Sequence, residues 1–295
     1  MAVTFGLSLS VSWICCLLIG GITCFTLKGN AHGHPAYTGP EPTGSYAQAS
    51  VVSGPNAKAT GHNATSAEAT GHNATSAEAT GHNATSAEAT GHNATSAEAT
   101  GHNAMSSVKS GPGASVEATG PGASAEATGP GASAVASGPG ASAEATGPGA
   151  SAEATGPGAS AEATGPGASA EATGPGASAV ASGPGASAVA TGPGASAEAT
   201  GPRASSAEAT GHNVTSAEAT GHNATSAEAT GHNAMSSVKS GPGASVVASG
   251  PGASVVASGP GASAEATGPG ASAEAAGPGA SAEATSLEQT ARPLN

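Results

Sequence analysis

The sequence predicts an intrinsically disordered, low-complexity tandem repeat, in which short extended or polyproline-like segments are broken by transient turns. Three observations predict it. Residues 61–285 form one tandem array, Gly (47 residues) and Pro (21) make up nearly a quarter of the chain, and no aromatic residue follows Tyr46. Ordering a residue costs about 1–2 kcal/mol in backbone entropy, which large buried side chains normally offset. We therefore expect no hydrophobic core in the array, and a helix only in the N-terminal apolar segment.

That N-terminal segment, residues 1–27, carries no charged side chain and is apolar through most of its length. Such a run is typical of a secretory signal peptide or of an uncleaved membrane anchor. The small or aliphatic residues at 22–24 predict cleavage after Cys24, and residues 31–33 are a later candidate site. The first basic residue, Lys28, follows the run, whereas a type II anchor has its basic residues before the span. A signal peptide at 1–24 is therefore favoured over a signal anchor or a buried helix of a folded domain.

The rest of the chain has three parts. Residues 25–60 are a short lead-in with degenerate repeats, 61–285 are the array, and 286–295 are a polar tail. The array contains ten-residue units such as Gly-His-Asn-Ala-Thr-Ser-Ala-Glu-Ala-Thr and nine-residue units such as Gly-Pro-Gly-Ala-Ser-Ala-Glu-Ala-Thr. Residues 101–116 and 231–246 are identical, which indicates that a two-part block was duplicated.

One unit gives little local structure by itself. Six residues of Ala-Ser-Ala-Glu-Ala-Thr are too few for a stable helix, and the Gly-Pro that follows opposes helix continuation. The pair Pro121-Gly122 suits the two central positions of a type II turn. A stacked solenoid needs an apolar face in every repeat, which we do not expect alanine and occasional valine to supply. Collagen is excluded because glycine is not at every third position.

Charge and cysteine content exclude further classes. The net charge is −13 with only six Lys and Arg residues, which argues against a nucleic-acid partner. The three cysteines, Cys15, Cys16 and Cys24, all lie in the N-terminal apolar segment, so the array has neither a disulfide framework nor a Cys-based metal motif.

The functional groups of the repeat side chains are mostly hydroxyl groups. Repeated Ser and Thr with nearby proline are typical of O-glycosylated, mucin-like stalks. The candidate O-glycosylation sites are Thr65, Thr70, Ser124, Thr128, Thr155 and Thr164. Six sequons in the ten-residue units add candidate N-glycosylation sites, which are Asn63, Asn73, Asn83, Asn93, Asn213 and Asn223. A repeat that contains Asn-Ala-Thr by chance and stays unmodified is the alternative. Asn103 and Asn233 lack the sequon because methionine replaces the threonine.

Histidine recurs once in each ten-residue unit. Histidine is the commonest metal ligand, but these residues lie ten apart without a second ligand of fixed geometry. We expect solvated side chains, no metal site and no cofactor. No catalytic group is assigned, because every candidate nucleophile or base recurs in copies; the chain is not expected to be an enzyme.

With its signal-like start and its Ser/Thr/Pro/Gly/Ala array, the chain resembles secreted and cell-surface mucin-like proteins. It is also loosely similar to the polymorphic repeat mucins and repeat antigens of parasites. The resemblance implies an extended, glycosylated, secreted protein that serves multivalent display, hydration or shielding. Lectins, antibodies or other extracellular glycan-binding proteins would be its partners, and a membrane only if the N-terminal segment stays uncleaved, as in a type II surface protein. The alternatives are a silk-like structural matrix protein, which the Gly-Pro-Gly-Ala motif suggests, and an unmodified repetitive surface antigen.

Overall fold

The computed structural model describes ten stretches of the chain, which are residues 56–60, 65–70, 76–81, 85–90, 96–109, 112–203, 206–212, 216–221, 226–239 and 242–286. The chain divides into two compact units, Met1–Pro35 and Ala36–Asn295, and every described residue belongs to the second unit. The apolar segment for which a helix and a signal peptide are predicted lies outside these stretches. None of the described residues forms a helix that is long and apolar enough to span a membrane.

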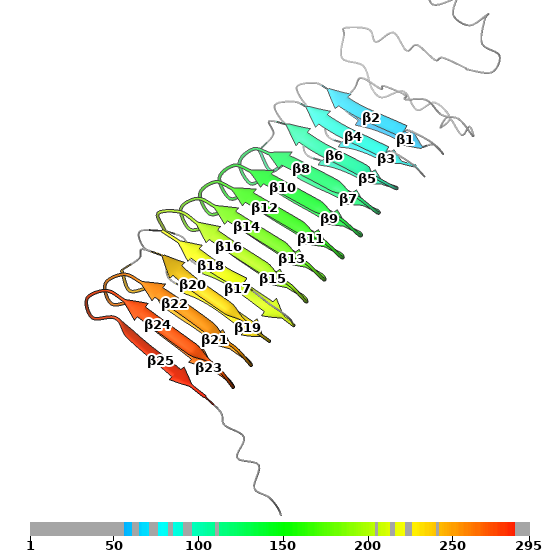
Figure 1. Cartoon of the computed structure of the whole chain (residues 1–295). Coiled ribbons are helices and arrows are strands. Elements are labelled where there is room, and N and C mark those ends of the chain that lie inside the picture. The colour runs from blue at the N-terminus through cyan, green and yellow to red at the C-terminus, as the bar shows by residue number, and fades with distance from the viewer. Residues whose placement is uncertain are drawn as a thin grey trace, which may run out of the picture. The chain divides into compact units, whose positions relative to one another are not determined.

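The described residues form a parallel β-solenoid, so the prediction of a disordered, low-complexity chain is wrong (Figure 1). Successive strands alternate between two sheets, which we call sheet A and sheet B. Sheet A contains the 13 odd-numbered strands and sheet B the 12 even-numbered strands, and each strand pairs with the strand two positions away in the chain. Two repeat units therefore complete one coil, and each unit supplies one strand.

The strands are short and nearly uniform. Sheet A consists of β1 (Asn56–Thr60), β3 (Ser76–Thr80), β5 (Ser96–Thr100), β7 (Ser115–Thr119), β9 (Ser133–Ser137), β11 (Ser151–Thr155), β13 (Ser169–Thr173), β15 (Ser187–Thr191), β17 (Ser206–Gly211), β19 (Ser226–Gly231), β21 (Ser245–Ser249), β23 (Ser263–Thr267) and β25 (Ser281–Thr285). Sheet B consists of β2 (Thr65–Thr70), β4 (Thr85–Thr90), β6 (Ala104–Lys109), β8 (Ser124–Thr128), β10 (Ser142–Thr146), β12 (Ser160–Thr164), β14 (Ser178–Ser182), β16 (Ser196–Thr200), β18 (Ser216–Thr220), β20 (Met235–Lys239), β22 (Ser254–Ser258) and β24 (Ser272–Ala276).

The motif Ser-Ala-Glu-Ala-Thr stays in register whatever the length of the unit. Ser142 pairs with Ser160 where two nine-residue units make a coil. Ser66 likewise pairs with Ser86 where both units have ten residues. The extra residue of the longer unit is thus accommodated outside the paired motif.

Small and polar residues alternate along each strand, and this alternation builds the core. In β8, Ala125 and Ala127 point inward and are 1% and 0% exposed, whereas Ser124, Glu126 and Thr128 point outward. Alternation with period two is the pattern of a strand with one buried face. The apolar side chains of the interior are alanines, with five fully buried valines as the largest of them.

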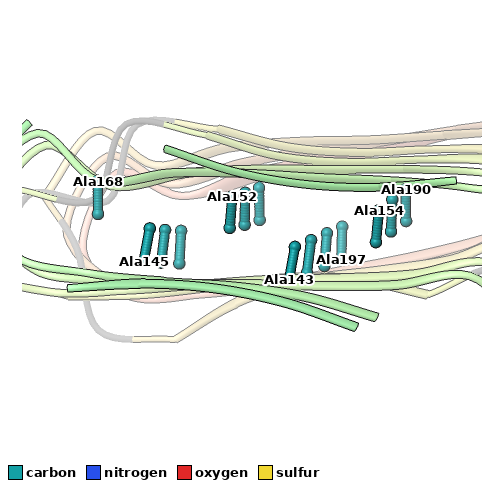
Figure 2. Close-up of a cluster of buried hydrophobic side chains, with 14 of the residues drawn as sticks. Ala143, Ala145, Ala152, Ala154, Ala168, Ala190 and Ala197 are labelled. Atoms are coloured by element: carbon teal, nitrogen blue, oxygen red, sulfur yellow. The ribbon is translucent and has the colours of Figure 1, made fainter. Parts of the chain in front are cut away.

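Figure 2 shows how alanine side chains lie between the two sheets. Ala152 and Ala154 of sheet A extend toward Ala143 and Ala145 of sheet B, and all four are at most 1% exposed. The inward alanines of the two sheets belong to one buried cluster, so the interior is filled largely by the smallest apolar side chain. The expectation that alanine could not supply an apolar face was therefore wrong.

The Gly-Pro-Gly segment forms the corner between strands. The Ala123 N–H donates to the Gly120 carbonyl oxygen at 3.1 Å, and Gly122 has a φ of 68°. This geometry is a type II turn with Pro121 and Gly122 at its centre, which confirms the turn predicted from the sequence.

Hydrogen bonds between coils explain the place of proline. The Gly120 N–H donates to the Ser137 carbonyl oxygen, and the Gly122 N–H donates to the Pro139 carbonyl oxygen, each at 2.8 Å. Pro121 lies between these two donors and has no N–H of its own. Proline therefore occupies a corner position without interrupting the bonding between coils.

The two glycines of a corner are required for different reasons. Gly156 has a φ of 138°, and a Cβ there would collide with the carbonyl group of Gly138 in the preceding coil. Gly158 has a φ of 69°, but a Cβ there would meet only open space. Asn103 and Asn233 take the place of the second glycine with φ values of 54° and 55°. Asparagine tolerates this left-handed region better than most residues.

An enlarged interior side chain should destabilise the solenoid. We expect Ala154→Leu to lower the free energy of unfolding by about 1–3 kcal/mol, because the thin interior has no room for three more carbons. The outward neighbour gives a matched control, since Thr155→Leu should change it by no more than about 0.5 kcal/mol. Urea denaturation followed by circular dichroism measures both. Equal effects of the two variants would contradict the buried alanine core.

The corner glycines give a second test. Gly158→Ala should cost about 1–2 kcal/mol, the usual penalty of a left-handed conformation. Gly156→Ala should cost more, because it adds a collision with the backbone of the preceding coil. Thermal unfolding midpoints rank the variants, and the stacking of the corners is refuted if Gly158→Ala proves the more damaging substitution.

Candidate functional surface

The outward side chains of the solenoid form columns that run across the strands. Each full Ser-Ala-Glu-Ala-Thr strand contributes one Ser, one Glu and one Thr to the outer face of its sheet. Because the strands are parallel and in register, each of these residues lies beside the same residue type of the next strand. Neighbouring strands in a sheet are about 4.8 Å apart. We call these arrays the Ser, Glu and Thr columns; each sheet has one of each.

Four of the predicted O-glycosylation sites lie in these columns. Thr155 on sheet A and Thr164 on sheet B belong to the Thr columns and are exposed. Ser124 and Thr128 belong to the two hydroxyl columns of sheet B and are half-buried. The structure thus places these hydroxyl groups on paired strands, not on the disordered acceptor that the sequence suggested.

The remaining predicted sites fall mostly outside the described residues. Thr65 and Thr70 are the first and last residues of β2, and their side chains are not among those described. All six sequon asparagines lie in undescribed stretches, and they are Asn63, Asn73, Asn83, Asn93, Asn213 and Asn223. Asn103 and Asn233, which occupy the same position of the unit without a sequon, are exposed at corners.

Hydroxyl groups in the columns bond to one another and to glutamate. The Ser187 and Ser206 hydroxyl oxygens, on adjacent strands, are 3.1 Å apart. The Ser272 hydroxyl donates to the Ser254 hydroxyl oxygen at 3.3 Å. Within one strand, the Thr200 hydroxyl donates to a Glu198 carboxylate oxygen at 3.4 Å. Some neighbouring members of the columns are therefore joined by hydrogen bonds.

The Glu columns are interrupted at short intervals. Among the described strands, no unbroken run exceeds three glutamates. The column of sheet A reads Lys58, Glu78, Glu98, Glu117, Val135, Glu153, Glu171, Val189, Glu208, Glu228, Val247, Glu265 and Glu283. That of sheet B reads Glu68, Glu88, Ser107, Glu126, Glu144, Glu162, Val180, Glu198, Glu218, Ser237, Val256 and Glu274. Like charges directly opposite one another destabilise a sheet, so each neutral residue relieves repulsion.

The electrostatics of two sites illustrate this repulsion and its relief. Glu144 stands between Glu126 and Glu162, and its pKa is raised by partial desolvation and, secondarily, by repulsion from Glu162 and Glu126. At the N-terminal end of sheet A the column begins with a cation, since Lys58 Nζ lies 3.1 Å from Glu78 Oε1. Sequence reasoning missed these columns, because their members come from units that are not adjacent in the chain.

One pair of histidines from the ten-residue units stacks, among the residues that the structure describes. The rings of His212 and His232, both exposed, have centroids 5.6 Å apart at an interplanar angle of 28°. Within the described stretches, no group of three or more His, Cys, Asp or Glu side chains is placed to hold a metal ion.

The duplicated block contributes two exceptions that sequence reasoning did not identify. Ser106 and Ser236 replace inward alanines, are 3% and 2% exposed, and have no hydrogen-bond partner for their hydroxyl groups. On the outer face of sheet B, the adjacent Met105 and Met235 are 56% and 49% exposed. A buried hydroxyl without a partner is destabilising, and nothing in the structure explains its presence here.

Comparisons of this chain with protein-family models, with curated proteins and with solved structures give no match.

The raised pKa of Glu144 predicts a pH dependence of stability. A carboxyl group whose pKa is higher in the folded than in the unfolded state destabilises the fold when it is ionised. This destabilisation is lost as the pH falls through the raised pKa of the folded state toward the ordinary pKa of 4.5. We expect Glu144→Gln to raise the midpoint of thermal unfolding at pH 7 and to reduce the gain in stability on acidification. Glu153→Gln is the control, because Glu153 lies between Val135 and Glu171 and has a glutamate on one side only. Equal shifts for the two variants would contradict repulsion within the column.

Proposed function

We propose that this protein is a non-catalytic, secreted or cell-surface repeat protein whose solenoid displays polar groups in regular columns for multivalent contact or shielding. The observation that carries the proposal is the repetition of one outward pattern in register on both sheets. Adjacent copies such as Thr155 and Thr173 are held on paired strands. A partner with several binding sites would therefore meet a fixed lattice of identical groups, which favours simultaneous engagement.

Glycans would be part of this display. The six sequons all belong to ten-residue units, so N-glycans would be confined to the two regions that contain those units, 61–110 and 211–240. The nine-residue units would carry hydroxyl and carboxylate columns, with the exposed Thr155 and Thr164 as the most accessible O-glycosylation candidates described. Lectins, antibodies and other glycan-binding proteins are the partners that such a surface suits.

Intact mass spectrometry of the protein isolated from its own cells tests the proposal. We expect a heterogeneous mass above that of the polypeptide, which collapses after enzymatic removal of N- and O-glycans. A first residue near Phe25 would support secretion with cleavage after Cys24. A mass equal to that of the bare polypeptide would overturn the glycan-bearing function and leave the unmodified antigen or matrix alternatives.

A matched pair of variants assigns the N-glycans. Asn83→Gln removes a sequon and should lower the native mass by one N-glycan. Asn103→Gln changes the same position of a unit that has no sequon, so the glycan mass should stay the same. Loss of glycan mass in the second variant, or its retention in the first, would count against the assignment.

A further inference from the structure

At the C-terminal end of the solenoid, β24 and β25 are the last strands of sheets B and A, and each pairs on one side only as far as the described residues extend. The inward residues Ala282 and Ala284 of β25 are exposed, although the equivalent residues of β23, Ala264 and Ala266, are 2% and 0% exposed. Unpaired strand edges are templates for another chain, and repeat proteins usually cover their last repeat with a polar face.

The opposite end differs from the C-terminal end in the charge of one column. β1 and β2 are the first strands of sheets A and B, and each is also paired on one side only within the described residues. β1 has Lys58 at the position that Glu274 and Glu283 occupy in β24 and β25. The Glu columns thus start with a cation at one end of sheet A and finish with an anion at the other end of both sheets.

We propose that the C-terminal end of one molecule binds the N-terminal end of a second copy, and that both sheets continue head to tail across the junction. This proposal does not depend on glycosylation. It rests on the exposed inward alanines of β25, on the one-sided pairing of the end strands among the described residues, and on the repetition of one unit.

The odd number of strands determines how the copies fit. Sheet A has 13 strands and sheet B has 12, so the next strand position after β25 lies on sheet B, beside β24. A second copy turned by half a coil would place its β1 beside β24 and its β2 beside β25 without a gap. Because every coil consists of two equivalent units, a half-coil turn places each strand of the second copy where the next strand of the first copy would follow.

In this arrangement Lys58 of the second copy lies opposite Glu274. The chain already contains the same pairing, since β1 and β3 are parallel and Lys58 Nζ lies 3.1 Å from Glu78 Oε1. At the junction Lys58 would stand between two glutamates. On the other sheet, Glu283 would lie opposite Glu68 of the second copy, which is a like-charge pair.

The junction joins different surfaces of identical molecules and does not close into a ring, so it would generate unbranched filaments. Association of the flat faces is opposed, because both carry Glu columns of the same sign. Growth would therefore proceed along the solenoid axis.

Two charge reversals on the last coil test the register. With the full-length protein in sedimentation velocity over a range of concentrations, Glu274→Lys should weaken self-association on the order of three- to tenfold, because it sets lysine against Lys58. Glu283→Lys changes the net charge by the same amount but faces Glu68, so it should strengthen association by a similar factor. Equal effects, or effects of opposite sign to these, would overturn the proposed junction.

Substitutions at the edge of β25 give an independent test. Ala284→Lys directs a charge inward at the end of sheet A and should abolish association, whereas Thr285→Lys adds the same charge on the outer side and should preserve it. Wild-type protein that remains monomeric at all concentrations would overturn the proposal and indicate that the chain's own flanking residues cover the ends. Electron microscopy of the wild type should show unbranched filaments one solenoid wide.

Discussion

The narrow space between the two sheets is the constraint on which the rest of the structure depends. Methyl groups such as those of Ala143 and Ala152 fill this space, and the largest side chains fully buried there are valines. Small residues at alternate positions allow the sheets to approach, and polar residues at the other positions must then face solvent. The two outer faces and their columns are thus a consequence of the same alternation that forms the core.

Hydrogen bonds between successive coils stabilise the solenoid in addition to the small apolar core. Described Gly-Pro-Gly corners bond to the corner of the next coil, as Gly122 does to Pro139, and the strands pair in register within each sheet. Parallel pairing of identical motifs has a cost, because it stacks glutamates at about the strand spacing of 4.8 Å. The valines and serines in the Glu columns reduce this cost, so these substitutions have an electrostatic role that no single unit reveals.

The sequence predicted the turn at the corners but not the strands or their long-range order. The turn at Pro121 and Gly122 follows from the residues alone, because proline and glycine favour its two central conformations. The alternation of Ala125 and Ala127 with polar residues is present in the sequence, but the prediction of disorder weighed only the scarcity of large side chains against backbone entropy and did not consider it. The Glu columns could not be found in one unit, since neighbours such as Glu144 and Glu162 come together only through pairing with the strand two units away. N-glycosylation of the sequon asparagines stays a prediction from the sequence.

The alternation of units between sheets has a consequence for how such a gene can change in length. Loss or gain of one unit would transfer every later strand to the opposite face, whereas loss or gain of two would leave each face with its original residues. The duplicated block conforms to the second case, since Met105 and Met235 both lie on sheet B, in β6 and β20. Unequal recombination that adds or removes an even number of units would lengthen or shorten the solenoid, and each later strand would stay on its original face.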